Sequence, residues 1–484
     1  MEVKRIDNYI DGKWVPSDSS QLLDVVNPAT GALLAQVPLS AQDEVGKAIK
    51  AARDAFLGWR ETPPLARARS FFKLRDLMEE RSEELARVIV QEEGKTLDDA
   101  RGEVRRAIEN VEVATGIPSL MMGSNLEDVA KDIDCDAVRQ PIGVFCAIPP
   151  FNFPFMVSLW FMPFAVACGN TYIVKPSEQV PLSQNSLFEL IDEAGFPRGV
   201  MNLVNGAKEV VDALLESKDV NGVSFVGSAT VAKHVYRKAA EHGKRVQCLG
   251  GAKNFLVAMP DAVLDRTAAA IISSAFGAAG ERCLAAAVVL AVGDIYEPLR
   301  AKLVELASNL KVGYGLDETV QMGPVVSRRH LDRVLGYIEK GVQEGARLIL
   351  DGRQIRVDGY PNGCFVGPTI FDHVKPDMVI ANEEIFGPVL GLIRVRDLDE
   401  ALAIMDANPY GNATAIFTSS GKWAREFKYR VRCGMVGINI GVPAPMAFFT
   451  FTGWKDSFFG DLHGHGRDAI EFFTEKKIVT SRWF

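Results

Sequence analysis

The sequence offers little that would indicate a disulfide framework or a metal centre. Its seven cysteines are an odd number, lie far apart and include no CxxC pair, and its six histidines include no HExxH. This pattern argues against disulfide bonds and structural zinc, and it is typical of free thiols in a reducing compartment. We therefore expect a cytoplasmic protein without a bound metal.

Long apolar runs and dense positive charge are also missing. The most apolar stretch, Phe153 to Cys168, spans 16 residues and contains two prolines, whereas a transmembrane helix needs about 20 apolar residues, so we predict a buried helix there. Residues 1–15 contain no apolar core of a signal peptide. The net charge is −8, from 54 basic and 62 acidic residues without a Lys/Arg-dense stretch. We therefore predict no membrane partner and no nucleic-acid partner.

The composition is that of a large globular protein of the α/β class. Its 484 residues are 48% hydrophobic and 24% charged, which allows about three folding units of ~150 residues each. Helical periodicity dominates residues 40–116. Short apolar strands then alternate with helices over 141–251 and again over 261–436. Such alternation predicts doubly wound parallel sheets with helices on both faces.

Three shorter segments have a different pattern. Asp11-Gly12 lies between two short strand-like stretches and predicts a tight hairpin turn. Residues Ser124–Gln140 alternate like a separate ribbon, and Lys477–Trp483 is strand-like. Because exposed strand edges favour pairing with another chain, we expect the ribbon and this tail to join copies of the protein.

Polar residues at the ends of two predicted strands suit a nucleotide. Ligands of open parallel sheets bind beyond the carboxyl ends of the strands, at helix N-termini. Lys175 and Glu178 could bind a ribose or phosphate there, although a surface ion pair is the simpler alternative. Gly227 and Ser228 could approach a pyrophosphate, or Ser228 could simply cap a helix. Neither place has a GxGxxG motif.

Two further residues suit chemistry at a carbonyl carbon. Cys283 follows the small-residue loop Gly277–Gly280 and lies beside Arg282, which would favour a reactive thiolate, although a buried inert thiol is the alternative. Asn152, in PPFNFPF, could donate a hydrogen bond to an oxyanion or could satisfy a loop carbonyl.

The motifs PFNFP, VKPSE, FVGS, LGGAKN, GERC, EEIFGP and FTGWKDSFFGD occur in order along nearly the whole chain. Together they resemble the NAD(P)-dependent aldehyde dehydrogenases. The resemblance implies that Cys283 attacks the aldehyde and that Asn152 and the Cys283 N–H hold the oxyanion. The residues that it implies for cofactor binding are Phe151, Lys175, Glu178, Gly227, Ser228, Gly250, Glu384 and Phe386. Glu178 would repel a 2′-phosphate, which favours NAD over NADP.

The resemblance also implies a domain organisation. We expect an NAD-binding domain of residues 1–120 and 140–250, and a catalytic domain of residues 251–452. An oligomerisation ribbon and tail would comprise residues 121–139 and 453–484. Because members of this family form dimers and tetramers, we predict a homotetramer.

One departure from the family pattern bears on the reaction. Hydrolytic members carry a glutamate immediately before LGG, as the base that activates water, whereas this chain has Cys248 there. Loss of a general base typically costs about 10²–10⁴-fold in rate, so water should attack the acyl-enzyme slowly. Coenzyme A is then the expected acyl acceptor. The stretches GGAKN, GERC and VPAPMAFFTFTGWKDSFFGD are similar to the CoA-acylating branch that acts on methylmalonate and malonate semialdehydes.

That branch implies a substrate site and a reaction. Its two carboxylate-binding arginines correspond to Arg105 and Arg282, although a solvated helix face is the alternative for Arg105. The implied reaction oxidises the semialdehyde with NAD, releases CO2 and transfers propionyl or acetyl to CoA. Many relatives have His after GGAKN where this chain has Phe255, and this difference bears on substrate choice or acyl transfer.

Two alternatives remain open from the sequence. The first is a hydrolytic dehydrogenase of another small acidic semialdehyde, of the succinate or sulfonated type, against which Cys248 argues. The second is a non-catalytic relative, which would predict loss of Cys283 or Asn152, and both residues are present.

Overall fold

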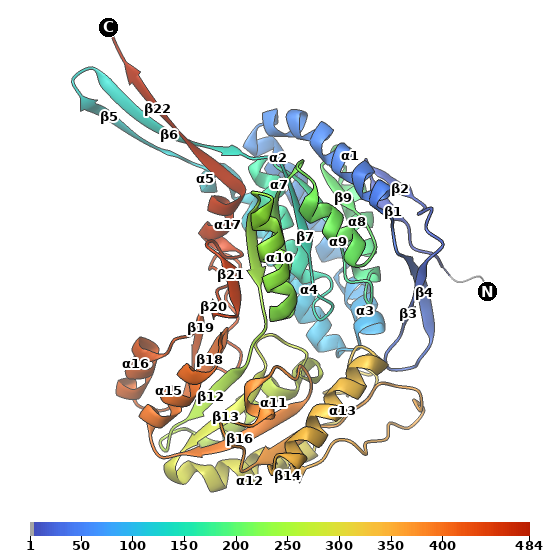
Figure 1. Cartoon of the computed structure of the whole chain (residues 1–484), viewed down its shortest axis with the longest axis vertical. Coiled ribbons are helices and arrows are strands. Elements are labelled where there is room, and N and C mark those ends of the chain that lie inside the picture. The colour runs from blue at the N-terminus through green and yellow to red at the C-terminus, as the bar shows by residue number, and fades with distance from the viewer. Residues whose placement is uncertain (1–3) are drawn as a thin grey trace.

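The computed structural model describes residues 4–484, which form two large sheets and a projecting ribbon (Figure 1). The first sheet has eight strands in the order β2-β1-β9-β8-β7-β10-β11-β21. They are β1 (Asn8–Ile10), β2 (Lys13–Val15), β7 (Val144–Ile148), β8 (Thr171–Val174), β9 (Met201–Leu203), β10 (Val220–Val226), β11 (Arg245–Leu249) and β21 (Phe458–Gly460). The central strands β9, β8, β7, β10 and β11 are parallel, and β1, β2 and β21 are antiparallel additions.

Helices cover both faces of this sheet, as the doubly wound prediction requires. Val144, Cys146 and Ile148 of β7 pack in one core with α1, α9 and α10, whereas Phe145 and Ala147 pack in another with α2, α4, α7 and α8. This division follows from the strand period of two, which points successive side chains to opposite faces. The helices are α1 (Gln42–Glu61), α2 (Pro64–Glu80), α3 (Ser82–Glu93), α4 (Leu97–Thr115), α5 (Ile117–Leu120), α6 (Met156–Leu159), α7 (Met162–Cys168), α8 (Leu182–Ala194), α9 (Lys208–Glu216) and α10 (Ala229–Glu241).

The apolar stretch before Cys168 is buried, but it is not one continuous helix. It forms the two short helices α6 and α7, whose residues are all buried. Pro163 stands in the first turn of α7, where its missing N–H leaves no bond to close a preceding helical turn. Among the described residues, no helix is both long and apolar enough to cross a membrane.

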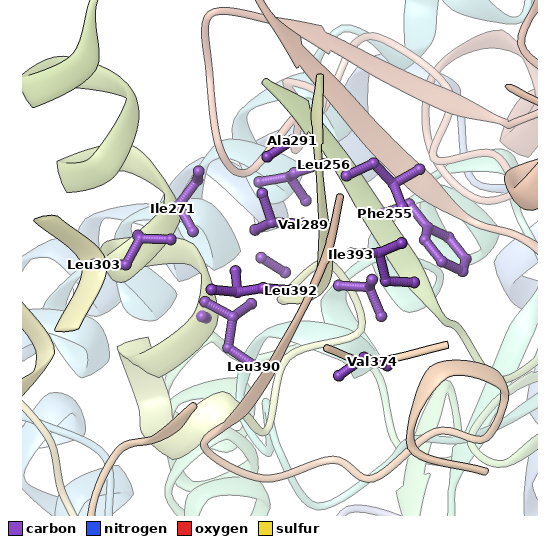
Figure 2. Packing of buried hydrophobic residues seen from close by; sticks show 14 of the residues in the cluster. Phe255, Leu256, Ile271, Val289, Ala291, Leu303, Val374, Leu390, Leu392 and Ile393 are labelled. Carbon is purple, nitrogen blue, oxygen red and sulfur yellow. The ribbon is translucent and has the colours of Figure 1, made fainter. Parts of the chain in front are cut away.

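The second sheet has seven strands in the order β14-β15-β16-β13-β12-β18-β19, all parallel except β14. They are β12 (Asn254–Ala258), β13 (Ala286–Val292), β14 (Arg347–Leu350), β15 (Thr369–Asp372), β16 (Val389–Val395), β18 (Ala413–Phe417) and β19 (Met435–Ile438). Their helices are α11 (Leu264–Phe276), α12 (Tyr296–Ser308), α13 (Arg328–Gln343), α14 (Val379–Asn382), α15 (Leu398–Ala407) and α16 (Gly421–Arg430). Figure 2 shows part of their aliphatic core, with Leu256, Val289 and Leu392 from three adjacent strands beside Ile271 and Leu303 from α11 and α12.

The predicted ribbon is a hairpin of β5 (Ser124–Ala130) and β6 (Ile133–Pro141) that projects from the body (Figure 1). The tail strand β22 (Thr474–Arg482) pairs with β6 of its own chain, from Thr474 opposite Pro141 to Arg482 opposite Ile133. The resulting order is β22-β6-β5, so within the described chain the outer edges of β5 and β22 have no partner strand. Pairing between copies therefore stays a prediction, now for those two outer edges.

The remaining elements are small. Asp11 and Gly12 have φ angles of 53° and 68°, so the tight turn predicted between β1 and β2 is confirmed. Helix α17 (Gly466–Phe473) precedes the tail strand. The two further strand pairs are β3 (Leu22–Val26) with β4 (Leu33–Pro38), and β17 (Tyr410–Gly411) with β20 (Trp454–Lys455).

Candidate active site

A cavity of about 360 Å³ lies beside Cys283. Its apolar wall includes Phe153, Met156, Trp160 and Phe451. Charged side chains from α4 and from the segment before β13 form another part of the wall. The volume and the mixture of an apolar wall with a few charged groups are typical of a site for a small molecule.

The loop that carries Cys283 is held by the ends of two strands of the second sheet. The Cys283 carbonyl oxygen accepts hydrogen bonds from the side-chain amides of Asn254 and Asn412, both at 2.8 Å. Asn254 begins β12 and Asn412 precedes β18. Before the cysteine, Ala278 and Ala279 have φ angles of 47° and 50°, a conformation that side chains rarely adopt. These hydrogen bonds therefore hold the backbone of Cys283 beside the second sheet.

The Cys283 thiol is protonated at rest. Burial, followed by the charge of Glu384, raises its pKa to about 12, against smaller opposing effects of its own N–H, Arg282 and the Leu284 N–H. A thiolate at this position needs nearby positive charge or N–H donors that stabilise it, and a group or solvent molecule that accepts the proton. The N–H groups and Arg282 are placed to stabilise it once formed.

Asn152 is buried, with 4% of its surface exposed, and it spans two loops of the site. Its side-chain nitrogen donates to the Glu281 carbonyl oxygen at 2.8 Å, so the loop-carbonyl alternative holds for one amide hydrogen. An amide nitrogen carries two hydrogens, and the second remains for an oxyanion. The two functions weighed from the sequence are therefore compatible.

A buried ion pair, which sequence reasoning missed, holds the PFNFP loop. Lys95 Nζ lies 2.7 Å from Glu103 Oε2 and donates to the Asn152 carbonyl oxygen, also at 2.7 Å. Glu103 Oε1 accepts the N–H groups of Phe155 and Met156 at 2.9 and 3.1 Å. Both charged side chains are fully buried. Because the pair lies far from Asn152 in the sequence, only the fold brings it there.

A second buried group links GERC to EEIFGP. Glu281 Oε1 lies 3.3 Å from His330 Nε2, and the same ring nitrogen is 2.6 Å from the Phe386 carbonyl oxygen. Burial and the charge of Glu93 raise the pKa of Glu281 well above its ordinary value. The sequence contains no local signal for this contact, since His330 lies in the first turn of a distant helix, α13.

The structure corrects one of the two expected arginines. Helix α4 turns once every 3.6 residues, so Arg105 and Arg106 point in different directions. Arg105 binds Glu79 and Glu112 outside the cavity, whereas Arg106 lines the cavity together with Glu103 and other residues of the same face. The candidate carboxylate ligand on this helix is therefore Arg106.

Arg282 lines the same cavity, where the sequence placed it. Its guanidinium forms an ion pair with Asp99 of α4, and the other Asp99 oxygen accepts the Ala278 N–H at 3.0 Å. Arg106 has a similar neighbour, because its Nη1 lies 3.0 Å from Glu109 Oε2. Each arginine is thus held in place by an acidic side chain of α4.

The two predicted nucleotide positions lie at the carboxyl ends of parallel strands. After β8, Lys175 Nζ lies 2.8 Å from Glu178 Oε2, and the lysine side chain is buried, so this is not a surface ion pair. After β10 come Gly227 and Ser228, and Ser228 makes no side-chain cap at the start of α10. The helix-cap alternative for Ser228 therefore does not hold. Its side chain caps none of the first N–H groups of α10.

The other expected cofactor residues come from loops of both sheets. Phe151 and Phe386 meet edge to face, with ring centroids 5.7 Å apart. Glu384 Oε1 accepts the Ala252 N–H at 3.0 Å, and burial raises the pKa of Glu384 to about 7. Gly250 donates its N–H to the Ser457 carbonyl oxygen at 2.9 Å, and a Cβ at Gly250 would lie 2.9 Å from the Asp456 carbonyl oxygen.

Two residues singled out by comparison with the family pattern point away from the cavity. Cys248 of β11 is fully buried in the core that contains Cys146, and burial raises the pKa of its thiol far above the ordinary value. Phe255 of β12 packs in the core of the second sheet with Ile393 (Figure 2). Neither side chain lines the cavity beside Cys283.

Comparison with known families gives the same assignment as the motifs. The sequence model of the aldehyde dehydrogenase family matches residues 14–479. The chain belongs to the aldehyde dehydrogenase family. The resemblance inferred from the motifs is thereby confirmed, as are the enzyme class and the α/β fold.

Several relatives of this aldehyde dehydrogenase are named for small acidic substrates. A protein of Geobacillus kaustophilus named malonate-semialdehyde dehydrogenase 3 is 52% identical over 482 residues, which cover 100% of this chain and 99% of the relative. The crystal structure of methylmalonate-semialdehyde dehydrogenase from Oceanimonas doudoroffii has a TM-score of 0.98 and 47% identity, covering 99% of each chain. The NAD⁺ complex of an aldehyde dehydrogenase from Bacillus cereus has a TM-score of 0.94 at 33% identity, covering 99% and 97%.

Proposed function

We propose that this protein is an NAD-dependent, CoA-acylating dehydrogenase of malonate and methylmalonate semialdehydes. The names of the relatives support this substrate class, and the arginines of the cavity suit its carboxylate. The products would be acetyl-CoA from malonate semialdehyde and propionyl-CoA from methylmalonate semialdehyde, each with CO2 and NADH.

The observation that carries the choice of acceptor is Cys248. It stands where hydrolytic members carry the base for water, and its thiol is closed into a hydrophobic core. A buried thiol with a strongly raised pKa cannot accept a proton from water at neutral pH. Water should therefore attack the acyl-enzyme slowly. The thiolate of CoA is a stronger nucleophile than water and is the acceptor that we propose.

The residues at the strand ends fit NAD. The buried Lys175 and its half-buried partner Glu178 suit the hydroxyls of a ribose, and the start of α10 after Gly227 and Ser228 suits a pyrophosphate. Gly250, Glu384, Phe386 and Phe151 would surround the nicotinamide end. When bound, NAD supplies the hydride acceptor for the oxidation.

The residues around Cys283 suit formation of a thioester. The Cys283 sulfur would attack the aldehyde carbon and lose its proton to solvent, while Asn152 Nδ2 and the Cys283 N–H hold the oxyanion. Removing one donor of such a pair typically costs about 10²–10³-fold in rate. Loss of hydride leaves an acyl group on sulfur. The bond to the carboxylate then breaks, its electron pair moves toward the thioester carbonyl, CO2 leaves and the carbon takes a proton from solvent.

Substrate recognition would fall to Arg106 and Arg282. A carboxylate that enters the cavity can bind both guanidinium groups, which Glu109 and Asp99 hold in place beforehand. Arg105 has no part in this proposal.

We further propose that the first sheet with its helices forms the NAD-binding domain and the second sheet the catalytic domain. The sheet of β5, β6 and β22 would join subunits of a homotetramer through its outer edges. Light scattering of the purified protein tests the tetramer, and a monomer would refute it.

Product analysis tests the reaction. The protein is incubated with malonate semialdehyde and NAD, with and without CoA, and acetyl-CoA, free acid and NADH are measured. We expect sustained NADH formation and acetyl-CoA only with CoA. Efficient release of free acid without CoA would instead support a hydrolytic dehydrogenase of an acidic semialdehyde.

A further inference from the structure

His465 is a buried polar side chain in the wall of the cavity that holds Cys283. It lies directly before α17, and only 3% of its surface is exposed. Within residues 4–484, neither of its ring nitrogens has a hydrogen-bond partner. Because a buried polar group without a partner costs about 1–3 kcal/mol, such a group at a ligand cavity indicates a partner supplied by the ligand.

His465 lies against two aromatic rings, and the charge that acts on its pKa is that of Arg106. Its ring meets Trp160 edge to face at 4.9 Å between centroids and lies 6.0 Å from the ring of Phe451. Burial, with a smaller contribution from Arg106, lowers the pKa of His465 to about 3. The imidazole is therefore neutral and carries one N–H donor and one acceptor nitrogen.

The position within the cavity selects the part of the substrate that His465 can reach. The aldehyde carbon must lie at Cys283, where Asn152 and a backbone N–H are available as donors. His465 shares the cavity wall with Arg106, whose charge acts on the imidazole. An N–H donor beside an arginine suits an anionic group better than it suits an aldehyde.

We propose that His465 is a specificity-determining residue that donates its ring N–H to the substrate carboxylate bound at Arg106. This inference rests on the proposed function, because it assigns one more contact to the same acidic semialdehyde. The neutral imidazole adds a directional hydrogen bond to the charge of Arg106 and satisfies its own donor only when an acidic substrate is bound.

Replacing the ring while keeping its shape tests the proposal. His465→Phe keeps the contacts with Trp160 and Phe451 but removes both nitrogens. We expect KM for malonate semialdehyde to rise about 10-fold to 100-fold, the range for a lost hydrogen bond to a charged group. The kcat for this substrate should change much less, and kcat/KM for propanal, which has no carboxylate, should change by less than about 3-fold. His465→Gln keeps an N–H donor and should recover part of the KM.

The control and the contrary results are defined by the same assay. His242→Phe changes an exposed histidine at the end of α10. It should alter neither KM for malonate semialdehyde nor kcat/KM for propanal. Equal losses for malonate semialdehyde and propanal in His465→Phe, or no loss for either, would overturn the inference. If His465→Phe does not fold in a thermal unfolding assay, His465→Leu carries the same expectation. Failure of the proposed function is distinct, because the unaltered protein would then show no preference for malonate semialdehyde over propanal.

Discussion

Adjacent arginines on helix α4 allow a sharp test of how the substrate is bound. Arg106 lines the cavity and Arg105 does not, although both are partly exposed, at 37% and 45% of their side chains. Replacing each with alanine removes the same charge from nearly the same place in the sequence. Only the direction of the side chain differs, so the pair of variants isolates the contact with the substrate.

The expected magnitudes differ by more than tenfold. A hydrogen bond to a charged group contributes about 1.5–3 kcal/mol, and 1.4 kcal/mol corresponds to tenfold in an equilibrium constant. Arg282 remains in Arg106→Ala and retains part of the attraction. We therefore expect kcat/KM for malonate semialdehyde to fall about 10-fold to 100-fold. Arg105→Ala loses surface ion pairs with Glu79 and Glu112, which contribute about 0–1 kcal/mol to stability and nothing to binding.

The assay is steady-state NADH formation with malonate semialdehyde and with propanal, in the presence of NAD and CoA. For Arg106→Ala, kcat/KM for propanal should change by less than about 3-fold, and Arg105→Ala should resemble the unaltered protein with both substrates. Comparable losses in the two variants, or a larger loss in Arg105→Ala, would refute the assignment of Arg106. So would an equal loss with both substrates in Arg106→Ala, because that result would indicate general damage to the site.

Three other predictions test the site and the fold. Lys95→Met leaves Glu103 buried without its partner, so thermal or urea unfolding should show a loss of about 3–5 kcal/mol, whereas Arg101→Met at an exposed ion pair should lose less than about 1 kcal/mol. The second concerns alkylation of Cys283 by iodoacetamide without NAD, followed by mass spectrometry. Its rate should keep rising from pH 7 to pH 10, because the pKa of Cys283 is raised to about 12 and the thiolate fraction rises with pH. A plateau near pH 8.5 would contradict this. Deleting residues 474–484 removes β22 from the ribbon and should convert the proposed tetramer to smaller species in light scattering, and an unchanged number of subunits would exclude the tail from assembly.

Much of the architecture was predictable because it depends on local periodicity. The alternation of buried strands with crossover helices indicated two doubly wound units, and Asp11-Gly12 indicated a tight turn, since both signals act over a few residues. The helix expected over the stretch before Cys168 was interrupted, because Pro163 acts on the hydrogen bonds of the preceding turn. The antiparallel additions to the sheets carried no local signal of their partner strand.

The candidate site also contains residues that short motifs could indicate and residues that only the fold brings together. Cys283, Asn152 and the strand-end residues could be proposed from motifs, since each motif is a short run of the chain. Arg105 was chosen over its neighbour because a motif does not reveal which helix face meets the cavity. The Lys95–Glu103 pair, the His330 contact and His465 had no local signal, because each joins segments that only folding brings together.

By itself, the order of motifs determined the family and predicted the chemistry that we propose at Cys283, because nucleophile, amide and glycine turns are encoded by residue type over short stretches. Only the tertiary structure decided which charged groups surround the cavity and which thiols are closed into cores. Side-chain direction and burial depend on packing between distant elements: α4 against the loop of Cys283, and β11 against β10 and β21. A linear sequence states the residues of those elements but not the faces on which they meet.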